Sequence, residues 1–114
     1  LKQDKAQDNT KIIIAKTNQS LREALDITAD NIYLSGWTLR THTHHDNVDS
    51  FDYSLIEDML DHAYKTKSSK ERHIVYFMKL GYYYKAVFKK AINSEGKDEV
   101  YLQTLIKSSN EIKY

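Results

Sequence analysis

The hydrophobic pattern of this chain changes its period near residue 70, and that change limits the possible folds more than any other feature. Apolar residues within 52–64 recur at the spacing of a one-sided helix. Three later segments are instead rich in aromatic and β-branched residues and are joined by short turns: 73–78, 82–91 and 99–107. Helices followed by a strand meander predict an α+β fold in which N-terminal helices pack on a C-terminal antiparallel β-sheet.

The first half of the chain carries shorter elements. A β-branched run predicts a strand over 11–15, and residues 31–34 are compatible with a further extended segment. Between them, Ser20 and Glu23 match the capping box that opens a helix, because each side chain can satisfy a free backbone N–H of the first turn.

Two more helices are predicted before the meander. Ser35 is a candidate N-cap for a helix over 37–45, and Asp52 is a candidate N-cap for the helix over 52–64. The polar segment 65–71 is predicted to be a loop.

The length of 114 residues accommodates one domain. Residues 1–10 are polar and lack aromatic residues, so we expect a flexible or linking segment there and a single domain over 11–114. The chain starts with Leu1 and shows no signal peptide, and we expect it to be a piece of a larger protein. The absence of Cys excludes a disulfide framework, a thiolate zinc site and a cysteine nucleophile. The longest apolar run, Ile12–Ala15, predicts no membrane-spanning helix.

Charge is distributed unevenly along the chain. Residues 1–64 hold 6 Lys/Arg and 11 Asp/Glu, whereas residues 65–114 hold 11 Lys/Arg and 5 Asp/Glu. The basic half interleaves its cations with Tyr and Phe, a composition that suits nucleic acid because bases stack on rings while cations hold phosphates. The alternative is a solvated sheet whose lysines prevent edge-to-edge aggregation.

A histidine cluster, His42, His44 and His45, lies in the predicted helix end. Three interpretations are open. His42 and His45 could bind a metal with Asp46 or Asp49; the cluster could be an ordinary polar helix end; or one His could act as a general acid/base beside a phosphate clamp. Arg40, Arg72 and Lys85 are the candidates for that clamp. With three Gly in the chain, a phosphate loop or a dinucleotide-binding fingerprint is excluded.

Three motifs follow one another in a recognisable order. A helix with His45 near its end precedes Asp52-Tyr53, a basic loop with Arg72 leads into a hydrophobic strand, and Gly81-Tyr82-Tyr83-Tyr84-Lys85-Ala86-Val87 precedes a strand with Thr104. This arrangement resembles the barnase/EndoU/colicin/RelE-like (BECR) nucleases, especially the branch found in phage proteins and polymorphic toxins such as those of contact-dependent growth inhibition.

The resemblance implies a metal-independent endoribonuclease that needs no cofactor and cleaves RNA, with tRNA as the first substrate to test. It implies catalytic roles for His45, with His42 or His44 as substitutes, and for Arg72, Lys85 and Thr104. RNA-binding roles are expected for Arg40, Tyr83, Tyr84 and Lys89. It further implies a parent effector or phage protein, delivery into the cytoplasm of a target cell, and a cognate immunity protein.

Two other classes of function stay open from the residues. One is a non-catalytic domain that binds RNA or protein through its Tyr/Lys sheet, and the other is a small metalloenzyme built on the histidine cluster. Trp37 is expected to be a core residue rather than a ligand platform.

Overall fold

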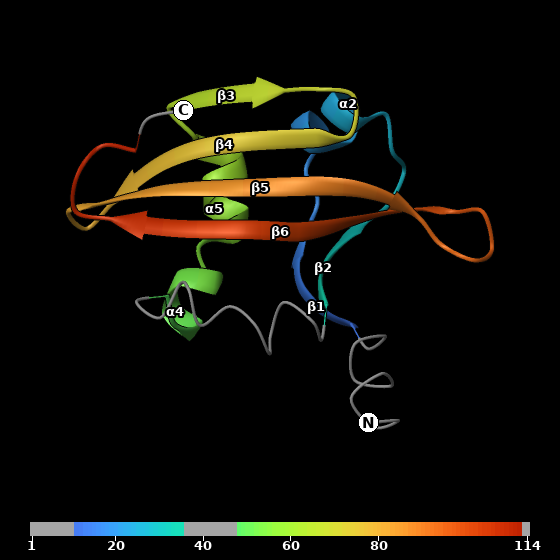
Figure 1. The fold of residues 1–114 in the computed structure, drawn as a ribbon, viewed down its shortest axis with the longest axis horizontal. Coiled ribbons are helices and arrows are strands. Elements are labelled where there is room, and N and C mark those ends of the chain that lie inside the picture. Colours follow the sequence, from blue (N-terminus) through green and yellow to red (C-terminus); the bar gives the residue numbers. More distant parts are fainter. Residues whose placement is uncertain (1–10, 36–47, 113–114) are drawn as a thin grey trace.

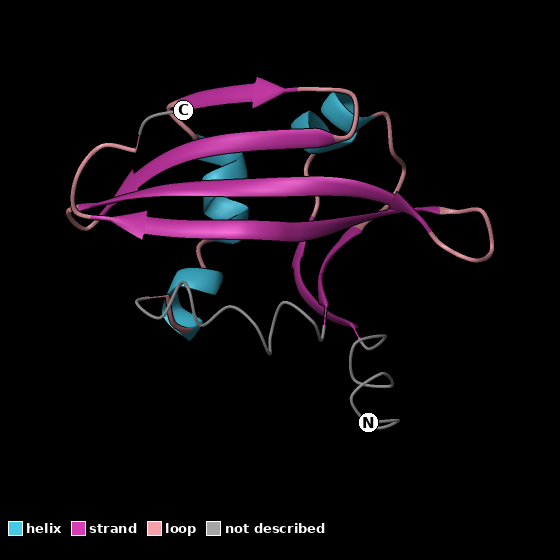
Figure 2. Cartoon of the chain, in the orientation of Figure 1, coloured by secondary structure: helices cyan, strands magenta, loops and turns pink. Residues whose placement is uncertain are grey.

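The chain forms an α+β domain with a mixed six-stranded sheet in the computed structural model, which describes residues 11–35 and 48–112. The described helices are α2 (Gln19–Leu25), α4 (Ser50–Tyr53) and α5 (Ile56–His62). The strands, shown in Figures 1 and 2, are β1 (Lys11–Lys16), β2 (Asn31–Ser35), β3 (Lys65–Ser68), β4 (Arg72–Lys79), β5 (Tyr82–Ile92) and β6 (Asp98–Ser108).

The sheet has the strand order β1-β2-β6-β5-β4-β3. The predicted antiparallel meander is confirmed in β4, β5 and β6. No bound of these strands differs from the expected one by more than one residue. The sheet is larger than expected, because β2 adds to the free edge of β6 in parallel orientation and carries β1 with it. The N-terminal part of the chain therefore contributes strands to the sheet as well as helices, and the sheet is mixed rather than purely antiparallel.

The β4–β5 connection is a tight two-residue turn, as predicted. Leu80 and Gly81 both have positive φ, at 54° and 83°. Such a turn matches the right-handed twist of the two strands that it joins. It fixes the register in which Met78 lies opposite Tyr83, and so decides which side chains share a face of the sheet.

The helix caps differ from the predicted ones. The N-cap of α2 is Asn18, whose side chain accepts from the backbone N–H of Leu21 at 2.9 Å, so Ser20 lies inside the first turn. The N-cap of α4 is Asp49, and Asp52 is its reciprocal partner in a capping box. The predicted single helix over 52–64 is also divided, because α4 ends at Tyr53 and α5 begins at Ile56.

The prediction of a loop over 65–71 was wrong for its first half. Residues 65–68 form β3, which pairs with β4 at the sheet edge. All four side chains of β3 are exposed, so the segment carries no apolar alternation that could reveal a strand. Its two lysines are typical of an edge strand that resists further pairing.

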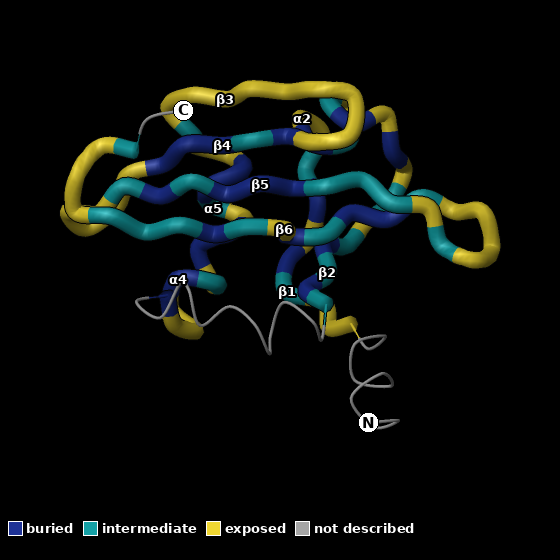
Figure 3. Tube along the Cα trace, in the orientation of Figure 1, coloured by how far each residue is buried: buried dark blue, intermediate teal, exposed yellow. Residues whose placement is uncertain are grey.

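The hydrophobic core lies between one face of the sheet and the helices. In Figure 1, α2 and α5 lie behind the long strands, and Figure 3 shows the buried residues concentrated in the middle strands and the helices. α5 packs on β4 and β1, and α2 packs on β4. The opposite face of β4, β5 and β6 carries no helix among the described residues.

Candidate nucleic-acid interface

One side of β4, β5 and β6 carries no helix formed by residues 11–35 or 48–112, and we call it the open face. It carries most of the sheet residues predicted to bind RNA. Side chains of a strand alternate between faces, and residues paired across a ladder share a face. Arg72 pairs with Lys89, and Val87 pairs with Thr104. Tyr83, Lys85 and Lys89 occupy alternate positions of β5 and so share one face. The five predicted residues on the open face are Arg72, Tyr83, Lys85, Lys89 and Thr104.

The cations of the open face are held by neutral contacts. Arg72 Nε donates a hydrogen bond to Gln103 Oε1 at 2.9 Å, and Lys85 Nζ lies 6.0 Å from the centre of the Tyr76 ring. Neither these two residues nor Lys89 forms an ion pair with a carboxylate among the described residues. Their charge is therefore available to an external anion.

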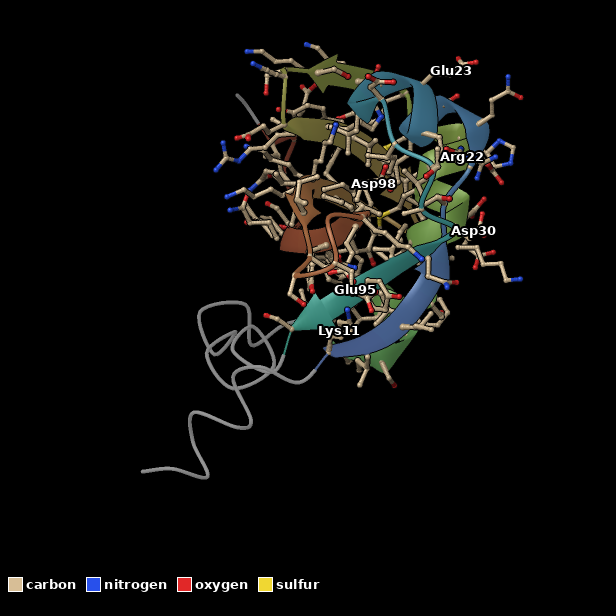
Figure 4. The ribbon with its side chains drawn as sticks, turned by 90° about the vertical axis from the view of Figure 1, so that its right-hand side faces the viewer. Lys11, Arg22, Glu23, Asp30, Glu95 and Asp98 are labelled. Atoms are coloured by element: carbon tan, nitrogen blue, oxygen red, sulfur yellow. The ribbon has the colours of Figure 1, made fainter. Side chains whose placement is uncertain are left out.

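The spacing of these cations is fixed by the strands. Lys85 and Lys89 are four residues apart on β5, which corresponds to about 13 Å along a strand. Val87 lies between them on β5, and Tyr76 of β4 lies opposite Lys85; both side chains are buried but neither belongs to the main core cluster. In Figure 4, nitrogen-tipped side chains project from the side of the sheet that points away from the helices. The open face thus carries separated cations beside the buried side chains of Tyr76 and Val87.

A β-bulge extends the open face in a way that simple alternation does not predict. Register shifts between Val87 and Phe88 of β5, so Gln103 of β6 is the extra residue. Counting by twos from Thr104 places Leu102 on the open face, but the bulge places Tyr101 there instead, opposite Lys89. The spacing of the apolar residues Val100, Leu102 and Leu105, two and then three, is the sequence signal for this bulge.

Tyr101 belongs to a polar aromatic cluster at one end of the open face. Its ring lies 5.7 Å from that of Tyr33, and its hydroxyl donates to Glu99 at 2.9 Å. Lys11 pairs with the same carboxylate and lies 4.6 Å from the Tyr33 ring centre. Burial acts to raise the pKa of Glu99, but the hydrogen bonds from Lys11, Tyr101 and Asn93 lower it overall. Glu99 is therefore a structural anion whose charge is already balanced.

Tyr84 is not available for stacking on a base, contrary to expectation. It points into the core and is 2% exposed, and its hydroxyl donates to Asp52 at 2.6 Å. Burial raises the pKa of Tyr84, and the neighbouring Asp52 raises it further. Strand alternation could have made the distinction, because Tyr84 shares its face with the apolar Ala86 and Phe88, whereas Tyr83 shares its face with Lys85.

The predicted catalytic histidines lie outside the described residues. His42, His44 and His45 fall in 36–47, together with Arg40 and Trp37, so their predicted roles stay predictions. Of the described histidines, His73 is buried on the core side, where its Nδ1 lies 2.6 Å from Ser68 Oγ and burial lowers its pKa. His62 is exposed at the end of α5.

Comparison with protein-family models, with curated proteins and with solved structures gives no match to this chain. Within residues 11–35 and 48–112, no group of three His, Cys, Asp or Glu side chains is placed to hold a metal ion. In the same residues, no helix has the length and apolar character needed to cross a bilayer. The chemistry of the open face is therefore the main guide to function.

The described part of the open face can bind anions and stack rings. It offers Arg and Lys for phosphate, Thr104 and Gln103 for hydrogen bonds, and Tyr83 for a base. Among its side chains on β4, β5 and β6 there is no imidazole, and its carboxylate at Glu99 is engaged. A histidine for proton transfer on this face has to come from outside these three strands.

Proposed function

We propose that this chain is a metal-independent endoribonuclease domain that binds RNA on the open face. The observation that supports the proposal is that five residues chosen from the sequence lie together on the open face: Arg72, Tyr83, Lys85, Lys89 and Thr104. Cations without a carboxylate partner, a stacking ring and a hydroxyl group are the elements that a single-stranded RNA site needs. The resemblance to BECR toxins adds the expectation of a delivered effector domain that acts in a target-cell cytoplasm and is inhibited by an immunity protein.

RNA supplies its own nucleophile, so the protein needs only to move protons and stabilise charge. His45, with His42 or His44 as substitutes, takes the proton of the 2′-hydroxyl as it attacks the adjacent phosphorus. Arg72 and Lys85 stabilise the extra negative charge on the phosphorane, and Thr104 orients the phosphate. A second group, His or Lys, protonates the leaving 5′-oxygen, and the products are a 2′,3′-cyclic phosphate and a 5′-hydroxyl.

Incubation of the purified chain with total tRNA in EDTA tests the proposal. The expected result is discrete fragments that end in a 2′,3′-cyclic phosphate, with DNA of the same length left intact because it lacks the 2′-hydroxyl. End-group analysis of the fragments provides the measurement. Intact tRNA at high protein concentration, or cleavage that requires added metal, would contradict the proposal.

A second candidate is an RNA-binding domain without catalytic activity. It is favoured by the absence of an imidazole among the open-face side chains of β4, β5 and β6. Under this hypothesis tRNA binds to the chain and is not cut, and replacement of His45 changes nothing. An acidic inhibitor that covers the basic face fits both candidates.

Both candidates predict that Lys85 contacts phosphate. Lys85→Ala is expected to weaken RNA binding and to lower by about one the slope of log K against log salt concentration. Lys90→Ala is the matched control, because Lys90 lies on the same strand but its Nζ donates to the carbonyl of Asp26, away from the open face. Fluorescence anisotropy with labelled RNA at several salt concentrations gives both slopes. Equal salt-dependence slopes for Lys85→Ala and Lys90→Ala would show that Lys85 does not contact phosphate.

A further inference from the structure

A small pocket lies at the end of the open face, beside the β4–β5 turn. It has a volume of about 260 Å³ and is lined by His62, Tyr64, Met78, Tyr83 and Glu111. Met78 and Tyr83 are directly paired in the sheet. The backbone N–H of Tyr64 donates to the carbonyl of Tyr76 at 2.9 Å, which holds Tyr64 beside the same strand. We call this the tyrosine pocket.

The walls of the tyrosine pocket suit a flat aromatic ligand. Tyr64 is 49% exposed and Met78 is 55% exposed, so large apolar surfaces are left open at one place. Grouped exposed apolar side chains mark binding sites more often than scattered ones do. Two tyrosine rings and a polarisable thioether are good partners for the face of a nucleobase.

The carboxylate of Glu111 lines the pocket together with the imidazole of His62 and the tyrosines Tyr64 and Tyr83. Burial raises the pKa of Tyr64, and the charges of Glu111, Tyr83 and Tyr76 raise it further, in keeping with the closeness of these groups. A carboxylate repels phosphate and accepts hydrogen bonds from N–H groups. The Glu111 side of the pocket therefore favours a base edge that carries donors over the RNA backbone.

Lys85 provides the neighbouring anion site. It lies two residues from Tyr83 on the same face of β5, about 6.6 Å along the strand. This separation lies within the reach of one nucleotide, so that a base in the pocket places its own phosphate near the lysine. Base and phosphate are thus recognised by adjacent side chains of a single strand.

We propose that the tyrosine pocket is a nucleobase subsite in which Glu111 accepts a hydrogen bond from an exocyclic amino group. The inference rests on the proposed function only in taking RNA as the ligand. Cytosine and uracil provide the sharpest comparison, since they have the same ring size. Cytosine presents an amino group where uracil presents a carbonyl oxygen, which a carboxylate repels.

Titration calorimetry with cytidine and uridine 3′-monophosphates tests the subsite. Cytidine 3′-monophosphate is expected to bind about tenfold more tightly, the effect of one charge-assisted hydrogen bond. Glu111→Gln is expected to bring the two affinities within about twofold, because the carboxylate charge is lost. Tyr83→Ala is expected to weaken both nucleotides about tenfold through loss of stacking.

Two matched variants control for charge and for ring loss. Glu95→Gln removes a carboxylate from the β5–β6 turn, where Figure 4 shows Glu95. Tyr82→Ala removes a tyrosine whose ring lies 4.4 Å from Lys107 Nζ, on the opposite face of β5. Both controls are expected to keep the wild-type preference for cytidine.

Equal affinities in the wild-type chain, a cytidine preference that survives Glu111→Gln, or no binding of either nucleotide would overturn the inference. Because binding is measured without cleavage, the two proposals fail separately. A chain that cuts RNA without this preference rejects the subsite alone. A chain that shows the preference and cuts no RNA rejects the ribonuclease alone.

Discussion

His45→Ala is expected to lower the rate of tRNA cleavage on the order of 10²–10⁴-fold, the usual contribution of a positioned general acid or base. The open-face side chains of β4, β5 and β6 supply cations and a hydroxyl group but no imidazole. The proposed mechanism therefore assigns proton abstraction from the 2′-hydroxyl to a histidine outside these strands, and the ordinary histidine pKa of about 6.5 suits that role near neutral pH. Single-turnover cleavage in EDTA gives the rate constant for each variant.

Two further histidine variants control the experiment. His42→Ala and His44→Ala test the two neighbours of His45 in the cluster. The controls are expected to keep at least a third of the wild-type rate. A large loss in His42→Ala or His44→Ala instead of His45→Ala would reassign the role within the cluster. Full activity in all three cluster variants would rule out histidine catalysis from this segment.

The C-terminal half of the fold was predictable because its signals are local. Each strand of the meander is rich in aromatic and β-branched residues, and Leu80-Gly81 marks the turn between β4 and β5. The N-terminal strands were harder to place. Their existence is visible in the β-branched run of β1, but the parallel pairing of Ile32 with Val100 joins residues 68 positions apart. No local pattern specifies such a contact.

The helix boundaries failed for a different reason. Asn18 and Ser20, and likewise Asp49 and Asp52, are all acceptable N-caps, and capping preference differs little among these residue types. Tertiary contacts decide between them. Asp52 is 0% exposed and bonds to Tyr84 and Lys107 of the sheet, so its side chain serves the core as well as the first turn of α4.

The residues of the candidate site were predictable where side chains alternate regularly between the two faces of a strand. They were not predictable where a bulge interrupts this alternation. Lys85 and Lys89 are on one face of β5 by simple counting, and Tyr84 is excluded from it by the same rule. On β6 the bulge at Gln103 reverses the count, so Tyr101 was missed. Glu111 gives no sequence signal at all, because its nearness to Tyr64 arises only when the segment after β6 folds back.

Asp52→Ala is expected to lower the free energy of unfolding by about 3–5 kcal/mol, the usual result of removing one partner from a buried ion pair. Asp52 Oδ1 accepts from the Tyr84 hydroxyl at 2.6 Å, and Oδ2 lies 3.3 Å from Lys107 Nζ. The variant leaves both donors without their acceptor in the core and also removes half of the capping box of α4. Urea denaturation followed by circular dichroism measures the change.

Asp58→Ala is the matched control for the loss of a carboxylate in an ion pair. Asp58 pairs with Lys79 at 3.0 Å, but both side chains are at least one-third exposed. Such surface pairs contribute about 0–1 kcal/mol, so a small effect is expected. Similar losses of unfolding free energy in Asp58→Ala and Asp52→Ala would show that the buried contacts of Asp52 with Tyr84 and Lys107 stabilise the fold no more than a surface ion pair does.

The contribution of Asp52 is expected to disappear in acid. Burial acts to raise the pKa of this carboxyl, but hydrogen bonds from Tyr84, the Asp49 backbone and Lys107 lower it overall. A folded-state pKa below the unfolded value of about 3.9 means that the unfolded chain binds the proton more tightly, so protonation favours unfolding. The stabilisation is fully present above about pH 5 and is lost as the pH falls through the folded-state pKa. The difference in unfolding free energy between the wild type and Asp52→Asn should therefore shrink below about pH 4. A difference that stays constant down to about pH 2 would mean that the charge of the Asp52 carboxylate does not stabilise the fold.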